Sequence, residues 1–260
     1  MSITNTPPVR FPSGVSTVPP AWAFANYPFP QPNRINQLFT DFDTYNSGDW
    51  TATTTNSGTI ALIDQNGGAV TLTSGATSGN VCGLEAVKKC FAFGAGAQVW
   101  YSINVSFVDA TLPTFMAGLS NTFVAVGPTD GVYFSKAASS TTMNLIIRAS
   151  STSTTIAVGT VANATAYSFS FYYNPYSSQA PGGKLWIYST IGLTAPTANY
   201  YPGGNQAIAS AYSGGTNTLT NLPASTVLLT PGFAIAASSS AAKAMTVDYM
   251  LAGEEILTRF

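Results

Sequence analysis

Histidine is absent from the 260-residue chain, and this absence removes several classes of chemistry at once. Histidine is the commonest general base, the commonest metal ligand and a member of the usual Ser and Cys hydrolase triads. Paired glycines such as Gly67-Gly68 and Gly182-Gly183 have neither a GxGxxG frame nor a following helix, so no phosphate-binding loop is predicted. The sequence therefore predicts a protein that is not an enzyme and that uses no cofactor.

Charged residues are also scarce. Lys and Arg number 9 and Asp and Glu number 10, which is 7% of the chain, whereas an average soluble domain has about 25%. The formal net charge is −1, and Lys88-Lys89 is the only adjacent basic pair, which speaks against nucleic-acid binding. A mostly neutral surface gives little repulsion between copies, so we expect a homo-oligomer, and specifically a homotrimer.

Cysteines and membrane-length apolar runs are few or missing. Cys82 and Cys90 are too few for a disulfide scaffold and have no partners for a zinc site, so we expect two buried thiols; a disulfide across a hairpin is the alternative. The apolar stretch 227–242 is interrupted by Pro231 and Gly232. The first eight residues lack the basic and apolar segments of a signal peptide. Neither a membrane protein nor a secreted one is predicted.

Carboxylate pairs are the remaining candidates for catalysis. Asp41 and Asp43 would share one face of a strand, but a solvated pair explains them better than a glycosidase site. Glu254 and Glu255 would lie on opposite faces, and we expect them to end a strand in solvent. The run 41–49 is rich in oxygen ligands, but its glycine is misplaced for an EF-hand and no Glu follows at the required distance. We therefore predict a turn there, and no metal site.

From residue 38 onward, short runs of β-branched and aromatic residues alternate with Gly, Asn, Ser or Pro, a pattern typical of strands and turns. The predicted strands are 59–64, 69–73, 98–108, 114–124, 131–135, 142–148, 155–161, 166–173, 184–189, 228–236 and 244–253. Asn66-Gly67 predicts a hairpin between the first two. The best helical candidate is a single turn at 34–39. We therefore predict an all-β fold, a two-sheet antiparallel sandwich of the jelly-roll type over residues 38–260.

Residues 1–37 have a different composition and are predicted to form an extended arm. Eight of the 16 prolines fall in the first 32 residues, a spacing that excludes strands and helices. Aromatic residues are interleaved with these prolines, and an arm left in solvent would gain nothing from them. We therefore predict that the arm binds a partner. The residues assigned to this contact are Phe11, Pro19, Pro20, Trp22, Phe24, Tyr27 and Phe29.

The segment 190–226 is rich in Gly, Ala, Tyr and Pro and is long for a loop, which favours a contact surface. Tyr200, Tyr201 and Tyr212 fit such a surface. The Tyr and Trp residues of the chain could also form a carbohydrate-stacking platform, although packing in the core and at interfaces explains most of them. Whether the segment binds a protein partner or a glycan stays open.

Three groups of residues, taken in order, carry a resemblance. They are Asp41-Phe42-Asp43 followed by Asp49-Trp50-Thr51, then the run 129–134 (TDGVYF), then the run 229–233 (LTPGF) leading into 243–249 (KAMTVDY). Over residues 38–260 the chain resembles a family of tailed-bacteriophage virion proteins described as capsid decoration or cement proteins, whose body is similar to a concanavalin- or laminin-G-like jelly roll.

The resemblance implies a structural subunit on the outer surface of a phage capsid, made in the host cytoplasm and often arranged as trimers. Its partner would be the major capsid protein, bound across the junctions between capsid subunits so that the shell is stabilised. The resemblance implies no catalytic residues. The alternative from the same fold is a tail-associated, lectin-like protein that binds host carbohydrate.

Overall fold

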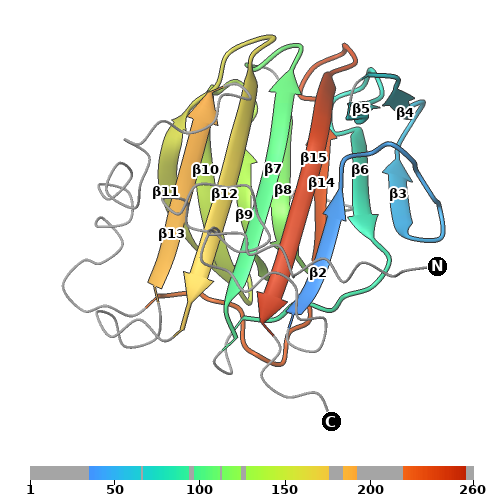
Figure 1. Ribbon diagram of the computed structural model, residues 1–260. Coiled ribbons are helices and arrows are strands. Elements are labelled where there is room, and N and C mark those ends of the chain that lie inside the picture. The colour runs from blue at the N-terminus through green and yellow to red at the C-terminus, as the bar shows by residue number, and fades with distance from the viewer. Residues whose placement is uncertain are drawn as a thin grey trace, which may run out of the picture.

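The computed structural model describes residues 35–65, 67–93, 97–111, 113–123, 127–175, 184–191 and 219–255. These residues form two antiparallel β-sheets packed face to face (Figure 1). The described ranges contain no helix, and hence none long and apolar enough to cross a membrane. The predicted all-β, two-sheet antiparallel sandwich is confirmed, and its form is consistent with a jelly roll.

The first sheet has seven strands in the spatial order β11-β10-β9-β8-β14-β6-β3. Their bounds in that order are Thr152–Thr160, Thr142–Ala149, Gly131–Lys136, Thr114–Ser120, Thr230–Ala236, Val81–Ala86 and Trp50–Thr54. Two strands, β11 and β3, therefore form its edges.

The second sheet runs β13-β12-β7-β15-β5-β4. Its strands are Lys184–Ile191, Ala166–Asn174, Val99–Phe107, Ala244–Glu255, Ala69–Thr73 and Thr59–Ile63. One further strand, β2 (Ile35–Thr40), pairs with the last residues of β15, whose first residues pair with β5. A bulge between Val247 and Met250 separates the two pairings on β15.

The inner faces of both sheets form one aromatic core. Tyr101 from β7 and Phe171 from β12 stack with ring centroids 5.7 Å apart, and Phe134 from the first sheet lies 6.1 Å from Phe171. The Tyr101 hydroxyl donates a hydrogen bond to the carbonyl of Gly232 in the opposite sheet. Complete burial raises the pKa of Tyr101 well above its ordinary value. Core packing thus explains most of the described aromatic residues, as predicted.

Two sequence predictions about the strands are wrong. The best helical candidate, a single turn at 34–39 without a convincing helical period, is a strand from Ile35 onward, because β15 provides a ladder of hydrogen bonds that local propensity does not reveal. The predicted strands also omit β3 and β6. β6 was missed because Gly83 lies in its middle, and glycine lowers strand propensity. Glycine fits this position because a Cβ there would lie only 2.9 Å from the Cβ of Ala234.

The predictions for the hairpin and the cysteines have mixed outcomes. β4 and β5 form the expected antiparallel pair, with Ile63 opposite Ala69, although Asn66 itself lies outside the described residues. Cys82 and Cys90 are both free thiols, so the disulfide alternative is wrong. Cys82 is buried, which raises its pKa to about 11, whereas Cys90 is exposed, contrary to the expectation of two buried thiols.

Candidate functional site

The residues predicted to bind a partner lie outside the described part of the chain. This holds for all of the arm residues, Phe11, Pro19, Pro20, Trp22, Phe24, Tyr27 and Phe29, and for Tyr200, Tyr201 and Tyr212 of the long segment. Their roles therefore stay predictions. The described residues offer instead the outer faces of the two sheets and the two ends of the sandwich.

The outer face of the second sheet is polar and aromatic, and we call its central part the hydroxyl face. Because the odd-numbered residues of β7 and of β12 lie in the core, the even-numbered ones lie on this face. Its members are Trp100, Ser102 and Asn104 of β7 and Ser168, Ser170 and Tyr172 of β12, which stand opposite one another in register. Alternation in the run 167–171 indicates that Ser168 and Ser170 share a face, but it does not indicate which residues of β7 lie opposite them.

Polar groups of the hydroxyl face hydrogen-bond to one another. Ser170 donates to Ser102 over 2.7 Å, and the Asn104 amide donates to the Ser168 hydroxyl over 2.8 Å. Trp100, Ser102 and Asn104 are only 4%, 6% and 3% exposed. Buried hydroxyls that are paired in this way are stable, but no general base stands beside either serine among the described contacts. The face is therefore suited to packing and recognition rather than to nucleophilic attack.

Gly253 fixes the position of the Trp100 indole. The two residues are opposite one another on β15 and β7, and a Cβ on Gly253 would lie 2.0 to 2.4 Å from three indole atoms. The ring therefore occupies the space that any other residue at 253 would need. Nothing in the local sequence signalled this contact, because the two residues are 153 positions apart and meet only when β15 pairs with β7.

The outer face of the first sheet is apolar where it is covered. Val81, Met116, Phe123, Tyr133, Ala234 and Ala236 form a second cluster of buried side chains, separate from the main core. Phe123 lies over Gly232, where a Cβ would come within 2.7 Å of its ring, and its backbone amide donates to the Glu85 carboxylate. Gly232 leaves room for the Phe123 ring and Glu85 binds the Phe123 amide, so both residues hold Phe123 against the sheet.

Lys136 is buried at one end of the sandwich. It follows Val132 and Phe134 on the inward side of β9, and its side chain is 0% exposed. The ammonium donates to four backbone carbonyls, those of Thr111, Pro113, Ala137 and Ser140. Burial lowers the pKa of Lys136 to about 8, while the nearby Asp109 charge acts in the opposite direction.

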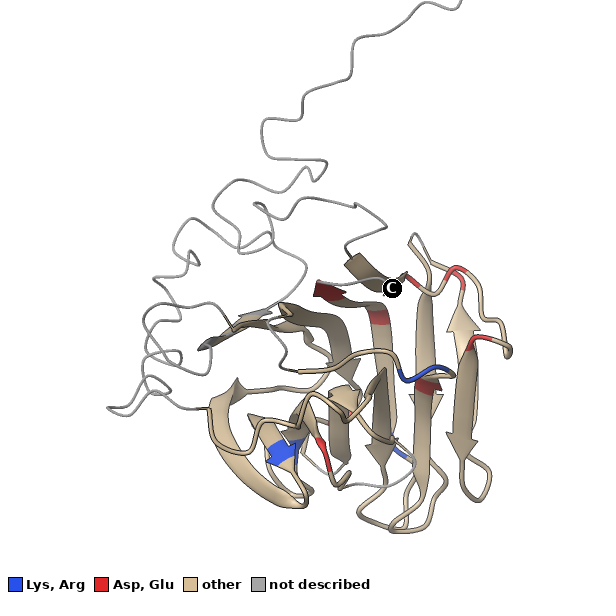
Figure 2. Ribbon diagram, turned by 90° about the horizontal axis from the view of Figure 1, so that it is seen from below, with Lys and Arg blue, Asp and Glu red and all other residues tan. Residues whose placement is uncertain are grey.

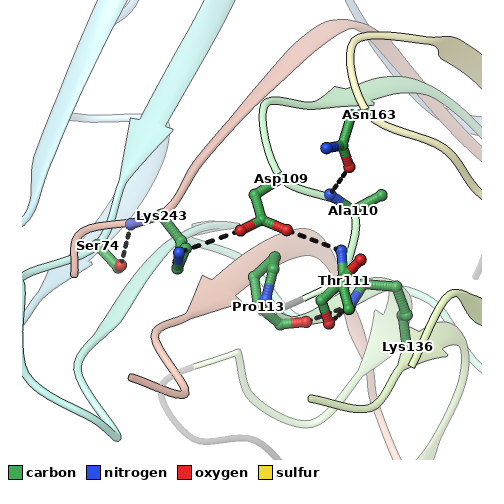
Figure 3. Close-up of polar contacts among 8 residues, drawn as sticks. All are labelled: Ser74, Asp109, Ala110, Thr111, Pro113, Lys136, Asn163 and Lys243. Atoms are coloured by element: carbon green, nitrogen blue, oxygen red, sulfur yellow. Dashed lines mark hydrogen bonds and ion pairs between the residues drawn. The ribbon is translucent and has the colours of Figure 1, made fainter. Parts of the chain in front are cut away.

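Asp109, whose charge acts on Lys136, forms an ion pair with a second buried lysine, Lys243 (Figure 3). Its carboxylate lies 3.2 Å from the Lys243 ammonium and also accepts from the Thr111 amide. The Lys243 amide donates in turn to Ser74. These contacts tie together loops from four parts of the chain, so the cluster is a structural fastening at this end of the sandwich.

Few charges remain for the surface once these contacts are counted. Of the described lysine and arginine side chains, only Lys88 and Lys89 are exposed. Most of the ribbon in Figure 2 carries no charged residue. The described surface is therefore even more neutral than the composition alone indicates.

Comparison with known proteins identifies the fold. No protein-family model and no curated protein sequence matches the chain. Among solved structures, a protein of unknown function from Shewanella oneidensis MR-1 has a TM-score of 0.52 at 12% identity, covering 88% of this chain and 90% of its own. Peanut lectin has 0.50 at 10% identity (86% and 99% covered), and an endo-1,3-beta-glucanase from Streptomyces sioyaensis has 0.51 at 11% (88% and 99%).

The chain shares the lectin-like jelly-roll fold. At these identities the likeness establishes the fold alone, and the fold occurs in a lectin and in a glucanase. A relationship to phage decoration proteins is not established by these matches. Function must therefore be argued from the residues.

The expected placement of Asp41 and Asp43 on one face of a strand is wrong. Asp41 and Asp43 follow the end of β2 and flank the buried Phe42, whose φ of 58° places it in a bend rather than in a strand. The turn predicted for 41–49 is confirmed. No group of three or more potential ligands among the described residues could hold a metal ion.

Glu254 and Glu255 are both partly buried, which corrects the expectation that they end β15 in solvent. Glu254 accepts a hydrogen bond from the amide of Ala92, which lies between the buried Phe91 and Phe93. Burial raises the pKa of Glu254 to about 7, and the Ala92 hydrogen bond opposes this shift only in part. The sequence could not reveal this burial, since the covering segment is 162 residues away.

The Glu254 carboxyl should make stability depend on pH. Its folded pKa of about 7 lies above its ordinary 4.5, so the native state retains a proton that the unfolded state releases. The contribution of Glu254 to stability is then fully present below pH 4.5 and is lost as the pH rises through 7. The loss is on the order of 2 kcal/mol once the shift is discounted for the partial exposure of this carboxyl. Glu254→Gln should remove this loss, so that urea denaturation shows the variant to be more stable than wild type at pH 8 and similar at pH 4.5.

Asp43→Asn provides the matched control, because Asp43 is an exposed carboxylate. It should leave the pH profile unchanged. A Glu254→Gln profile that still falls between pH 4.5 and 7 would contradict the assignment.

Proposed function

We propose that this protein works by surface contact rather than by catalysis, as a decoration subunit on the outer surface of a tailed-phage capsid. Its partners would be the major capsid protein and further copies of itself in a trimer. The observation that carries the proposal is the distribution of charge over the described residues. Lys136 and Lys243 are buried and bind other groups of the protein, and the hydroxyl face carries no charged side chain.

Neutral faces suit a protein that is permanently bound. Burying an unpaired charge in an interface is unfavourable, and the cores of protein interfaces are depleted of charged residues. The polar groups of the hydroxyl face hydrogen-bond to one another, so a partner that covers its half-buried members, Ser168 and Tyr172, displaces few hydrogen bonds to water. Such a surface can bind without the desolvation penalty that an ordinary charged surface incurs.

The composition of the N-terminal arm is a second reason to propose that the protein works by binding a partner. Its prolines limit the entropy lost on docking, and its aromatic rings supply apolar area. Burying Trp22, Phe24, Tyr27 and Phe29 would contribute on the order of 15 to 25 kcal/mol before ordering and association costs, which offset most of it. Several arms on one oligomer would bind together through their effective concentration.

Deletion of residues 1–32 should therefore abolish or strongly reduce occupancy on capsids while leaving the sandwich folded. The deletion ends before Ile35, so every described strand is retained. Occupancy is measured by quantitative gel analysis of particles that lack the protein after incubation with each variant. A control that replaces only Trp22, Phe24, Tyr27 and Phe29 by serine keeps the length of the arm and should have a similar effect.

Unchanged binding by both variants would place attachment in the sandwich and would contradict the role of the arm.

The second candidate is a lectin-like protein that binds carbohydrate on the hydroxyl face. Trp100 and Tyr172 are aromatic residues beside hydroxyl groups, a combination that stacks on and hydrogen-bonds to sugars. However, Trp100 is only 4% exposed, so a sugar could not reach its ring without displacing what covers it. Binding to a panel of bacterial surface polysaccharides that is lost in Trp100→Ala but not in the arm deletion would favour this candidate.

A further inference from the structure

The strand β11 lies at an edge of the first sheet. It is nine residues long, and among the described strands it pairs with β10 alone. Among the described residues, no backbone hydrogen bond outside the β10 ladder involves β11. Six of its nine side chains are exposed, those of Thr152, Ser153, Thr155, Ala157, Gly159 and Thr160. A strand of this kind presents a row of backbone amides and carbonyls that can pair with another strand.

The composition of β11 does nothing to prevent such pairing. No charged residue occurs between Arg148 and Lys184, and β11 contains no proline. Protective features of natural edge strands are charges, prolines, covering segments and bulges. Of these, β11 has a bulge at Val158 and a contact from the segment around Thr220 and Asn221, whose side chains hydrogen-bond to the side chain of Thr154 but not to the backbone of β11. The regular stretch before the bulge is Thr-Ser-Thr-Thr-Ile-Ala, which is rich in β-branched residues.

Other edges differ from β11. At the opposite side of the same sheet, β3 has five residues and follows the exposed Asp49. In the second sheet β4 also has five residues and is followed by the exposed Asp64. A charge beside a short edge strand discourages pairing, because a partner would have to desolvate it.

We propose that β11 pairs antiparallel with β11 of a second copy of this chain, about a two-fold axis. A register centred on Thr155 places each Thr155 opposite its counterpart, Ser153 opposite Ala157, and Thr154 opposite Ile156. Each pair then lies on one face of a sheet that continues through both copies. A second copy fits this edge. When a strand pairs with its own copy, any charged residue lies opposite or near a like charge, and β11 has no charged residue.

The contact is small, and this sets its expected strength. One pair of edge strands buries less area than the roughly 1,200 to 2,000 Å² of a standard interface. The isolated protein should therefore dimerise weakly, and more completely where its local concentration is high. The pairing does not depend on the proposed function; on a capsid it would join copies that belong to neighbouring trimers.

Charge reversal tests the pairing directly. Thr155 is exposed, so Thr155→Lys and Thr155→Glu should leave the thermal midpoint unchanged, but each places two like charges opposite one another in the dimer. Sedimentation equilibrium at up to about 1 mM should show dimers for wild type and at least about tenfold weaker association for each variant alone. An equimolar mixture of the two variants should regain the wild-type level of association, because Lys then faces Glu.

Thr51→Lys is the matched control, since Thr51 is an exposed threonine on the other edge of the same sheet. It should not affect association. The proposal is wrong if wild type is monomeric throughout this range, if association is insensitive to Thr155→Lys, or if the mixture of variants fails to associate. Loss of association in Thr51→Lys would instead indicate head-to-tail pairing of β11 with β3, which also overturns the proposal.

Discussion

Replacing Lys136 by methionine should lower the free energy of unfolding by about 3 kcal/mol. Methionine fills a similar volume, so the packing around Val132 and Phe134 is retained, but the donors to four carbonyls are lost. Each buried carbonyl left without a donor costs about 1 to 3 kcal/mol, and loop relaxation together with relief of the buried charge offsets part of the sum. Urea denaturation at pH 7 measures the difference.

Lys88→Met is the control for this prediction. Lys88 is exposed, and removing its charge should change stability by less than about 0.5 kcal/mol. If Lys136→Met were as stable as wild type, the four hydrogen bonds would not hold the end of the sandwich together.

Gly253→Ala should also be strongly destabilising, by about 2 to 3 kcal/mol. The new methyl group would overlap the Trp100 indole, which is rigid and cannot turn aside without leaving the hydroxyl face. Thermal unfolding gives the stability, and tryptophan fluorescence reports on the displaced ring. Trp100→Ala combined with Gly253→Ala should show a smaller effect than the sum of the single changes, because the overlap is then absent.

Gly159→Ala is the matched control, because Gly159 is also a strand glycine but a Cβ there would meet nothing within 4 Å. Its stability should equal or slightly exceed that of wild type. Equal effects of Gly253→Ala and Gly159→Ala would show that the close approach to Trp100 does not constrain residue 253.

Local patterns predicted the strands most clearly where inward and outward residues alternate, as in β10 and β12. The run Tyr167-Ser168-Phe169-Ser170-Phe171 shows one apolar and one polar face, and both faces occur as expected in β12. Where local preference and tertiary pairing disagree, the sequence misleads. At 35–40 a stretch that looks like a helical turn becomes β2 because β15 is available to pair with it.

Site features were harder to predict, because they depend on contacts between distant segments. Val132, Phe134 and Lys136 are every second residue of β9, so they lie on the same, inward face. This spacing is the one local sign that Lys136 is buried. Glu254 gave no such sign, since its burial depends on the segment around Ala92. Neither the Trp100–Gly253 contact nor the free edge of β11 can be recognised before the order of the strands is known.

The copy number of the protein in purified virions tests the central proposal most directly. A decoration subunit should be present in numbers comparable with the major capsid protein, and a cryo-EM map should place the jelly roll over the junctions between capsid subunits. Only a few copies per particle, located on the tail, would contradict the capsid role and favour the lectin-like alternative. Complete absence from the particle would contradict both.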